Sequence, residues 1–361
     1  MHGGYTRGAA LVAALILGMT ATVAAGCSGR DDGPSGPGTT DSTDGSDGTD
    51  GTDGTDGAAP PADTALWVDP DSPAARQAAE WERQGRAGDA EAMRLIAEQP
   101  IAEWPQAQGD PGPRVREVAR AADALGQTAV FVAYNIPHRD CGQYSQGGAA
   151  DGSAYLDWIG RLADGIGDSR AIVVLEPDAV PHLLDGCTAE MYHERRYELL
   201  SQAVQRLAEL PRTRVYLDAG NPSWVQDVRR LAEALRRAGV ERADGFSLNV
   251  SNYQTTEDVV AYGTRLSEQL DGAGFVIDTS RNGNGPAEGH GEESWCNPPG
   301  RALGRPPTLD TGLPLVDAFL WIKRPGESDG ECRGGPRAGE WWPEYALGLA
   351  REAQNGHRDG Q

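Results

Sequence analysis

The amino-acid sequence predicts an α/β fold in which a parallel sheet closes into a barrel. From about residue 64 onward, stretches with helical periodicity alternate with short apolar runs that contain β-branched residues. This pattern is typical of parallel strands covered by helices. Polar and ionisable residues follow most of the runs, and α/β barrels collect their functional groups in such loops, whereas open doubly wound sheets concentrate them at one switch point. A chain of 361 residues can hold one such domain.

The expected elements follow from the period of the apolar residues. Helices are expected at residues 74–87, 113–125, 153–166, 192–210, 224–238, 256–270 and 342–350. Strands are expected at residues 129–134, 171–175, 214–217, 245–250, 275–277 and 318–322, with 100–104 as a weaker candidate.

Each expected strand leads into side chains that could do chemistry. In chain order, the runs are followed by Asn135 and Asp140, by Glu176 and Asp178, by Asp218, by Asn249 and Asn252, by Asp278, and by Lys323, Glu327 and Asp329. Because the carboxyl ends of parallel strands share one face of a barrel, these groups are expected to converge there.

Four of these residues, Asp140, Asp178, Asp218 and Asp329, are candidates for the cleavage of glycosidic bonds. That reaction needs one carboxylic acid to protonate the leaving oxygen and a second carboxylate that acts as a nucleophile or as the base for a water. A single Asp at a strand end more often caps a helix or closes a turn. Four that follow strands of one sheet, with tryptophans nearby, favour a sugar-cleaving site.

Tryptophans in the same loops indicate how a sugar chain would be held. Sugar rings present apolar C–H faces that stack on indole rings, and Trp104, Trp224 and Trp295 lie in or beside the expected loops. An isolated Trp is more often part of the core. We assign Trp81 and Trp158, which lie on amphipathic stretches, to the core.

Composition and motifs exclude several other function classes. The net charge is −22, and no basic stripe is available to bind nucleic acid. The His-Arg-Asp sequence at 138–140 matches a kinase catalytic loop, but no Gly-rich phosphate loop or Asp-Phe-Gly sequence accompanies it. The Gly-x-Ser-x-Gly elbow of an esterase is also missing. We interpret His182, His193 and His290 as solvated or structural, and we expect no metal or cofactor.

Residues 1–26 are interpreted as a lipoprotein-type signal peptide. Arg7 precedes a short apolar segment at 9–19, and residues 24–27 resemble a lipobox whose Cys27 would carry the lipid. The alternative is an ordinary cleaved signal with an incidental Cys.

Residues 27–63 are rich in Asp, Gly, Ser and Thr and are expected to form a disordered tether. The catalytic domain would therefore span 64–361. The protein is expected to be extracellular, as a surface lipoprotein or secreted.

The cysteine count agrees with export. If Cys27 carries a lipid, four cysteines remain, namely Cys141, Cys187, Cys296 and Cys332. An even number in an exported chain predicts two disulfides, with three possible pairings. None of the four lies in a Cys-x-x-Cys pair, so a zinc site is not expected.

Seven segments, in order, resemble the motifs of glycoside hydrolase family six, whose members are endoglucanases and cellobiohydrolases. They are YNIPHRDC at 134–141, VLEPD at 174–178, YLDAG at 216–220, NVSNY at 249–253, DTSRNGNGP at 278–286, WC at 295–296 and WIKRPGESDG at 321–330. The resemblance runs from about residue 104 to the C-terminus and implies a distorted, seven-stranded barrel with its active site at the carboxyl ends of the strands.

The resemblance also implies roles for the catalytic residues. Asp178 would be the general acid of an inverting reaction, and Asp140 would raise the pKa of this acid and help to handle the water, as a nearby like charge does. Tyr134 would lie under the distorted sugar ring. Asp329 would be the base, and the rival is a proton relay through a second water and Ser145.

The same resemblance implies the substrate contacts and the disulfides. On the non-reducing side Trp104, Lys323 and Glu327 would bind the sugar chain, and Trp224 and Trp295 would do so on the leaving-group side. Asp218 and Asn249 would support the binding site. The disulfides would be Cys141–Cys187 and Cys296–Cys332. One departure is Asn221, where the family commonly has His.

The spacing near the C-terminus predicts the mode of attack. Exo-acting members have a long loop after the final Asp-Gly that roofs a tunnel, whereas here Gly330 is followed within a dozen residues by Trp341. We therefore expect an open cleft and a monomeric endo-β-1,4-glucanase that acts on cellulose-type glucans. The alternatives are an exo-acting cellobiohydrolase of the same family and a non-catalytic glucan-binding lipoprotein.

Overall fold

The computed structural model describes residues 65–287 and 294–359, all within one compact unit that spans Ala58–Gln361. The interpretations of residues 1–63, including the lipidation of Cys27, lie outside the described residues and stay predictions. The same holds for His290.

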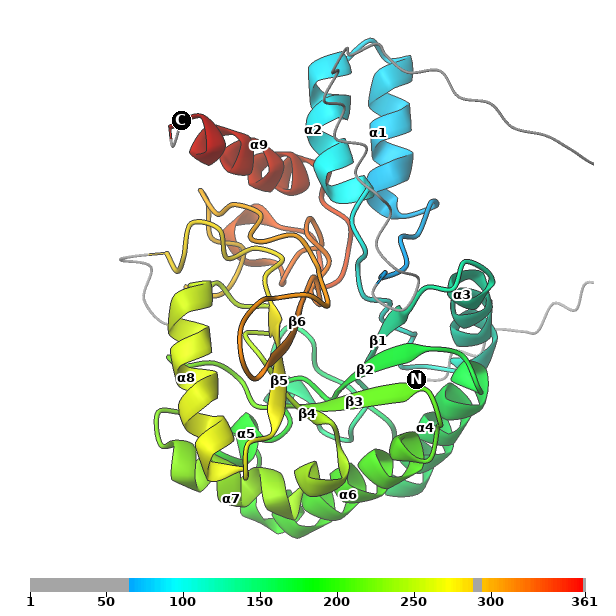
Figure 1. Cartoon of the computed structure of the whole chain (residues 1–361), viewed down its shortest axis with the longest axis vertical. Helices are drawn as coiled ribbons and strands as arrows, with labels where there is room; N and C mark the ends of the chain where they lie inside the picture. Colours follow the sequence, from blue (N-terminus) through cyan, green and yellow to red (C-terminus); the bar gives the residue numbers. More distant parts are fainter. Residues whose placement is uncertain (1–64, 288–293, 360–361) are drawn as a thin grey trace, which may run out of the picture. The chain divides into compact units, whose positions relative to one another are not determined.

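Six parallel strands form one sheet in the order of the sequence (Figure 1). They are β1 (Ala129–Ala133), β2 (Ala171–Leu175), β3 (Thr213–Asp218), β4 (Gly245–Leu248), β5 (Gly274–Asp278) and β6 (Val316–Leu320). Each strand pairs with the next in parallel, for example Phe131 with Val173. The strands are buried on both faces, which is why they appear in the sequence as continuous apolar runs.

The expected barrel of seven strands is corrected to six strands that curl into a half-barrel. The weak candidate at 100–104 forms only isolated parallel bridges, from Ile101 to Trp321 and from Glu103 to Phe131. It therefore lies between β1 and the residue that follows β6. Pro100 and Pro105 flank this segment, and because proline has no N–H to donate, the ladder cannot extend at either end.

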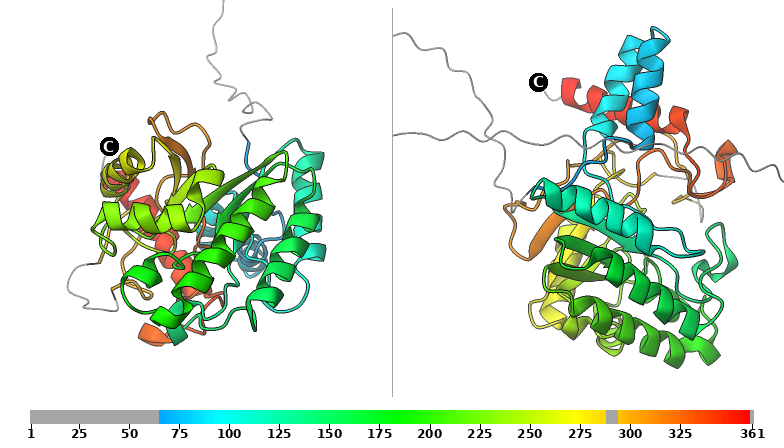
Figure 2. Two further views of the ribbon diagram at one scale, coloured as in Figure 1. Left: turned by 90° about the horizontal axis from the view of Figure 1, so that it is seen from below. Right: turned by 90° about the vertical axis from the view of Figure 1, so that its right-hand side faces the viewer.

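Nine helices are described. They are α1 (Pro73–Arg83), α2 (Ala87–Ala97), α3 (Gly112–Ala124), α4 (Gly152–Ile166), α5 (Pro181–Leu184), α6 (His193–Ala208), α7 (Val228–Arg237), α8 (Thr256–Gln269) and α9 (Pro343–Asp359). Figures 1 and 2 show α3, α4, α6, α7 and α8 along the outer side of the sheet, while α1, α2 and α9 pack together at one end. No described helix is both long and apolar enough to cross a membrane.

Two of these helices are absent from the sequence-based expectation. The stretch expected as one helix at 74–87 ends at Arg83, because Gly85 has a φ of +75° and turns the chain into α2. Helix α5 is a single turn, too short to show an apolar period, and it begins at Pro181.

Successive side chains of each strand point alternately to the two faces of the sheet, and this divides the core into two clusters. Phe131 and Val173 face a cluster shared with the outer helices. Val130, Val132 and Val174 face a second cluster on the other side of the sheet, which also contains the partly buried Trp104 and Tyr134. Because successive side chains of a strand point to opposite faces, one short apolar run supplies both clusters and brings the residue after it to the edge of the sheet.

Candidate active site

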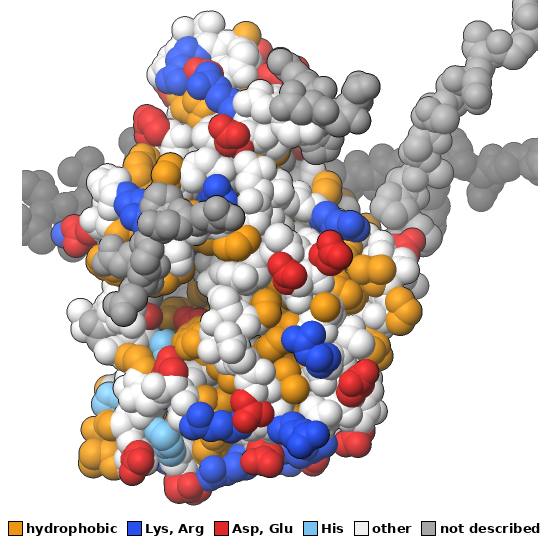
Figure 3. Space-filling model, turned by 90° about the vertical axis from the view of Figure 1, so that its left-hand side faces the viewer, with side chains coloured by type: hydrophobic (Ala, Val, Ile, Leu, Met, Phe, Trp, Pro, Cys, Tyr) orange, Lys and Arg blue, Asp and Glu red, His pale blue; other side chains and the backbone are white. Residues whose placement is uncertain are grey.

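A cleft of about 1040 Å³ lies at the carboxyl ends of the strands. Ten of the twelve residues predicted to be catalytic or substrate-binding line it, namely Trp104, Tyr134, Asp140, Ser145, Asp178, Trp224, Trp295, Lys323, Glu327 and Asp329. The space-filling view shows one face of the unit hollowed, with acidic and histidine side chains beside the hollow (Figure 3). The residues that follow the strands thus converge as the sequence predicts.

Asp178 follows β2 on a backbone in the left-handed region, with a φ of +70°, and Glu176 before it has a φ of +49°. Two buried carboxyl groups hold this turn. The backbone N–H of Asp178 donates to Asp218 Oδ2 at 2.9 Å, and the carboxylate of Glu176 accepts from the N–H groups of Asn135 and Ile136. The strained turn therefore also fixes the start of the loop after β1.

The carboxyl group of Asp178 has an unusually high pKa. Burial raises this pKa to about 6, the charge of Asp140 adds to the rise, and His182 and a hydrogen bond from Tyr134 oppose it. A carboxyl oxygen of Asp178 and one of Asp140 lie within 4.8 Å of each other. Beneath them, burial and the charge of Asp178 raise the pKa of Asp218 to about 7. Asp178 can therefore hold a proton in mildly acidic solution.

The loop after β1 holds Asp140 by its backbone. The N–H of Ser145 donates to Asp140 Oδ2, and the guanidinium of Arg139 donates to the carbonyl oxygens of Ser145 and Tyr134 at 2.8 and 2.6 Å. Burial raises the pKa of Asp140, although the hydrogen bond from Ser145 acts in the opposite direction. Asp140, Ser145 and Tyr134 are thus fixed relative to one another by Arg139, which sequence reasoning did not single out.

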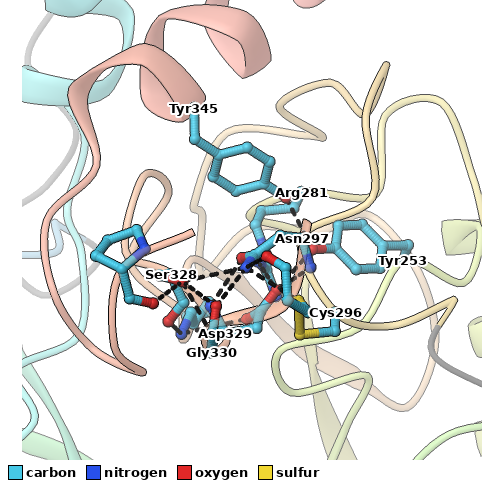
Figure 4. Close-up of a disulfide and its surroundings, with 11 residues drawn as sticks. Tyr253, Arg281, Cys296, Asn297, Ser328, Asp329, Gly330 and Tyr345 are labelled. Carbon is cyan, nitrogen blue, oxygen red and sulfur yellow. Dashed lines mark hydrogen bonds and ion pairs between the residues drawn. A yellow bond between two sulfur atoms is a disulfide. The ribbon is translucent and has the colours of Figure 1, made fainter. Parts of the chain in front are cut away.

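Both oxygens of the Asp329 side chain are engaged, and Figure 4 shows Arg281, Asn297 and Tyr253 around this residue. Oδ2 accepts from Arg281 Nη1 at 2.8 Å, from the Tyr253 hydroxyl at 3.1 Å and from the Asn297 N–H at 3.0 Å. Oδ1 lies 3.3 Å from Lys323 Nζ. Burial alone would raise the pKa of Asp329, but the two cations outweigh it and lower this pKa. Asp329 therefore stays ionised and is a weak proton acceptor.

Arg281 is the largest fully buried side chain of the described residues. It pairs with Asp329, donates to the carbonyl oxygen of Ser251 at 2.7 Å and lies over the ring of Tyr253 at 4.5 Å. Arg281 lies inside the segment at 278–286 that resembles a family motif, so its position in the sequence could have marked it as a residue of the site. Its partner could not be identified that way, because Asp329 is 48 residues away.

Two residues predicted to bind substrate do not line the cleft. Asp218 is fully buried beneath Asp178, where its carboxylate also accepts from Ser247 Oγ at 3.0 Å. Asn249 is fully buried too, and its side-chain amide donates to Asp278 O and Gln254 O and accepts from Gln254 N. Both side chains hold backbone in place instead of facing the cavity.

The predicted substrate-binding residues that do line the cleft are held by neighbouring groups. Trp104 donates from Nε1 to Ile322 O at 2.8 Å and packs edge-on against Tyr134 with ring centroids 5.6 Å apart. Glu327 accepts from Arg324 Nη1 at 2.9 Å. The rings of Trp295 and Tyr144 are 6.0 Å apart.

Asn221, which stands where the family commonly has His, also lines the cleft, and its side-chain oxygen accepts a hydrogen bond from the Ser223 hydroxyl.

His182, interpreted from the sequence as solvated or structural, lies in the site. It is buried beside Asp178 and Asp140, its Nδ1 is 3.2 Å from Asp185 Oδ2, and its ring packs edge-on against Trp224. His182 follows Asp178 by four residues, which is about one helical turn. This spacing is the signal by which the sequence alone could have placed His182 beside Asp178.

Both predicted disulfides are present, Cys141–Cys187 and Cys296–Cys332. The first joins the residue after Asp140 to the segment after α5. The second lies beside Asn297, whose backbone N–H donates to Asp329 and whose side chain accepts from Asp329 N and donates to Gly330 O. Each disulfide therefore ties a cleft loop to a distant part of the chain.

Comparison with known proteins assigns this geometry to a family. Residues 61–353 match the model of the glycosyl hydrolases family 6. The chain is 45% identical over 300 residues to Endoglucanase A of Cellulomonas fimi, covering 82% of this chain and 63% of that protein. It is 44% identical over 307 residues to Endoglucanase 1 of Streptomyces halstedii, covering 80% of this chain and 92% of that protein.

A solved endoglucanase structure is also similar to this chain. The endoglucanase Cel6 from Mycobacterium tuberculosis, in complex with methyl-cellobiosyl-4-deoxy-4-thio-β-D-cellobioside, has 41% sequence identity and a TM-score of 0.74. The match covers 82% of this chain and 98% of that one.

Proposed function

Because this chain belongs to the glycosyl hydrolases family 6, we propose that it is an inverting endo-β-1,4-glucanase with Asp178 as its general acid. The observation that carries the proposal is that Asp178, a partly exposed residue, lines a large cleft and has a carboxyl pKa raised to about 6 by burial. Such a group can protonate a glycosidic oxygen. The endoglucanase relatives support β-1,4-glucan as the substrate class.

In the proposed reaction, the proton of Asp178 passes to the glycosidic oxygen as the bond between this oxygen and the anomeric carbon breaks. A water attacks the same carbon from the opposite face. Asp140 is too close to Asp178 to stand across the bond, since carboxylates that flank a glycosidic bond are roughly 5 Å or more apart, whereas these two lie within 4.8 Å. Asp140 therefore acts as the charged neighbour of the acid.

The proton lost by the water needs an acceptor. Asp329 is poorly suited, because its oxygens are engaged by Arg281, Tyr253 and Lys323 and its pKa is lowered. We favour a route through a second water and Ser145 to Asp140, whose pKa is raised by burial. The hydrogen bond from the Ser145 N–H keeps Ser145 beside Asp140, and this route needs that proximity.

The short segment after Asp329 supports endo attack. Ser328 N donates to Glu340 O and Gly339 N donates to Ser328 O, so the segment between them folds back on its own base. An antiparallel bridge between Glu327 and Trp341 closes it. Residues of this segment line the cleft, but a short segment held at both ends in this way is unlike the long roofing loop of exo-acting members.

Carboxymethylcellulose tests the substrate and the mode together. We expect a steep fall in viscosity for each new reducing end, because internal cuts shorten the polymer at once. Reducing ends without loss of viscosity would show exo attack, and no cleavage of any β-1,4-glucan would favour the binding-protein alternative. Proton NMR of the first product formed from cellotetraose reports the anomer, and a β-anomer would contradict inversion.

The pH profile follows from the state of Asp178. Since the acid must carry its proton, kcat/KM is expected to fall as the pH rises through about 6, roughly tenfold for each further pH unit. The measurement is kcat/KM for cellotetraose across this range. If kcat/KM instead fell through pH 3.8, the ordinary pKa of Asp, the pKa of the acid would not be raised and the observation that carries the proposal would fail.

Export remains part of the proposal. The two disulfides fit an oxidising compartment outside the cytoplasm. Anchoring through a lipid on Cys27 rests on the sequence alone, and mass spectrometry of the mature N-terminal peptide would test it.

A further inference from the structure

His182 lies beside the proposed acid and lines the same cleft. Its backbone N–H donates to Asp178 O at 3.0 Å, which places it one turn after Asp178 at the start of α5. One ring nitrogen and one carboxylate oxygen from each of Asp178 and Asp140 lie within 4.8 Å of one another. Only 6% of the residue's surface is exposed. The imidazole is therefore largely shielded from water and close enough to both carboxyl groups to act on them.

Asp185 holds this imidazole in one orientation. Asp185 Oδ2 lies 3.2 Å from His182 Nδ1 and also accepts from Trp224 Nε1 at 2.9 Å, while Oδ1 accepts from Cys187 N at 2.8 Å. The ring of Trp224 packs edge-on against His182 at 4.8 Å. Because a carboxylate only accepts, Nδ1 carries a hydrogen, which fixes the ring. Asp185 thus links His182 to Trp224, and the backbone hydrogen bond from His182 links both to Asp178.

The groups that face His182 favour its charged form. They are Asp178 after β2, Asp185 after α5 and Asp140 in the loop after β1. The ring of Trp224 and the Cys141–Cys187 disulfide, which also lie beside His182, are uncharged. Burial opposes protonation, but the hydrogen bond to Asp185 and the three carboxylates outweigh it and raise the pKa of His182. In return, the imidazolium lowers the pKa of Asp178 and that of Asp140.

We propose, on the basis of the function proposed above, that His182 is a positioning residue whose imidazolium, held by Asp185, strengthens Asp178 as the proton donor to the leaving sugar. The imidazolium stabilises the carboxylate that remains once the proton has left. It does so from the side of Trp224, which we predict to hold the leaving-group sugars. No further cofactor or co-reactant is needed.

The variant His182→Gln tests the proposal, because glutamine can still bond to Asp185 but carries no charge. The alkaline limb of kcat/KM for cellotetraose should move to higher pH. At the plateau below this limb, cellotetraose turnover should fall about tenfold, because a weaker acid donates its proton less readily. Turnover of dinitrophenyl β-cellobioside should change little, because its leaving group needs no proton.

His193→Gln is the matched control. His193 lies outside the cleft lining and contacts the carbonyl oxygen of Thr188, so this variant should keep the wild-type profile. An unmoved limb in His182→Gln, or equal losses on both substrates, would show a purely structural role and overturn the proposal. If the wild type cleaves neither substrate, the proposed function itself fails.

A second measurement decides the matter should His182→Gln not fold. In Asp178→Asn, NMR titration of the histidines should show a lower pKa for His182 than in the wild type, because the coupling of two charges is reciprocal. An unchanged His182 titration would refute the coupling.

Discussion

Replacing Asp178 with Ala is expected to lower kcat/KM for cellotetraose by about 100-fold to 10,000-fold, the range that general acid catalysis contributes. The loss follows from the removal of the only proton donor that we assign to the leaving oxygen. Affinity for unreactive cellooligosaccharides should be retained, because the tryptophans and charged residues that line the cleft are unaltered. The measurements are initial rates on cellotetraose and calorimetric binding of a thio-linked oligosaccharide.

A matched carboxyl variant separates this effect from a general loss of folding. Asp317 in β6 also has a pKa raised by burial and accepts a hydrogen bond from Tyr216 at 3.0 Å, but it does not line the cleft. Asp317→Asn should therefore keep wild-type turnover. If Asp178→Ala keeps more than about a tenth of the activity, Asp178 is not the general acid. If the wild type binds glucan and never turns over, the protein is a binding protein.

Replacing Arg281 with Met is expected to lower the free energy of unfolding by about 3–5 kcal/mol, because it leaves the Asp329 carboxylate buried without its guanidinium. Arg281 is completely buried, and the Asp329 side chain is 4% exposed. Lys323 remains 3.3 Å from Asp329, which favours the lower end of this range. Denaturant unfolding of wild type and variant measures the difference.

Two further variants show how a loss of stability in Arg281→Met should be interpreted. Arg195→Ala removes an exposed ion pair with Glu198 and should cost no more than about 1 kcal/mol. Adding Asp329→Leu to Arg281→Met should restore part of the lost stability, because it removes the buried carboxylate that lost its guanidinium. The recovery is only partial, because Lys323 then loses its partner carboxylate. A loss below about 1 kcal/mol in Arg281→Met would contradict the role of the pair as a support of the cleft.

The sequence determined most of the sheet and the position of the cleft. Buried parallel strands are continuous apolar runs, so β2 was predicted without error and the bounds of the other strands agree to within a few residues. The residue that follows such a run must emerge at the carboxyl edge of the sheet, which is why Asp140, Asp178 and Asp329 could be placed in one site. The pairing of the four cysteines came from the resemblance to the family, because spacing alone leaves three possibilities.

Only the tertiary structure decided the number of strands and the partners of each charge. The segment at 101–103 lies between two prolines and forms bridges instead of a strand. Asp329 is held by Arg281, and His182 by Asp185 and Trp224, through contacts that the sequence does not specify. Whether a carboxyl group keeps its proton depends on burial and on neighbouring charges in space. For this reason the sequence could name Asp178 and Asp329, whereas the structure gave them opposite pKa shifts.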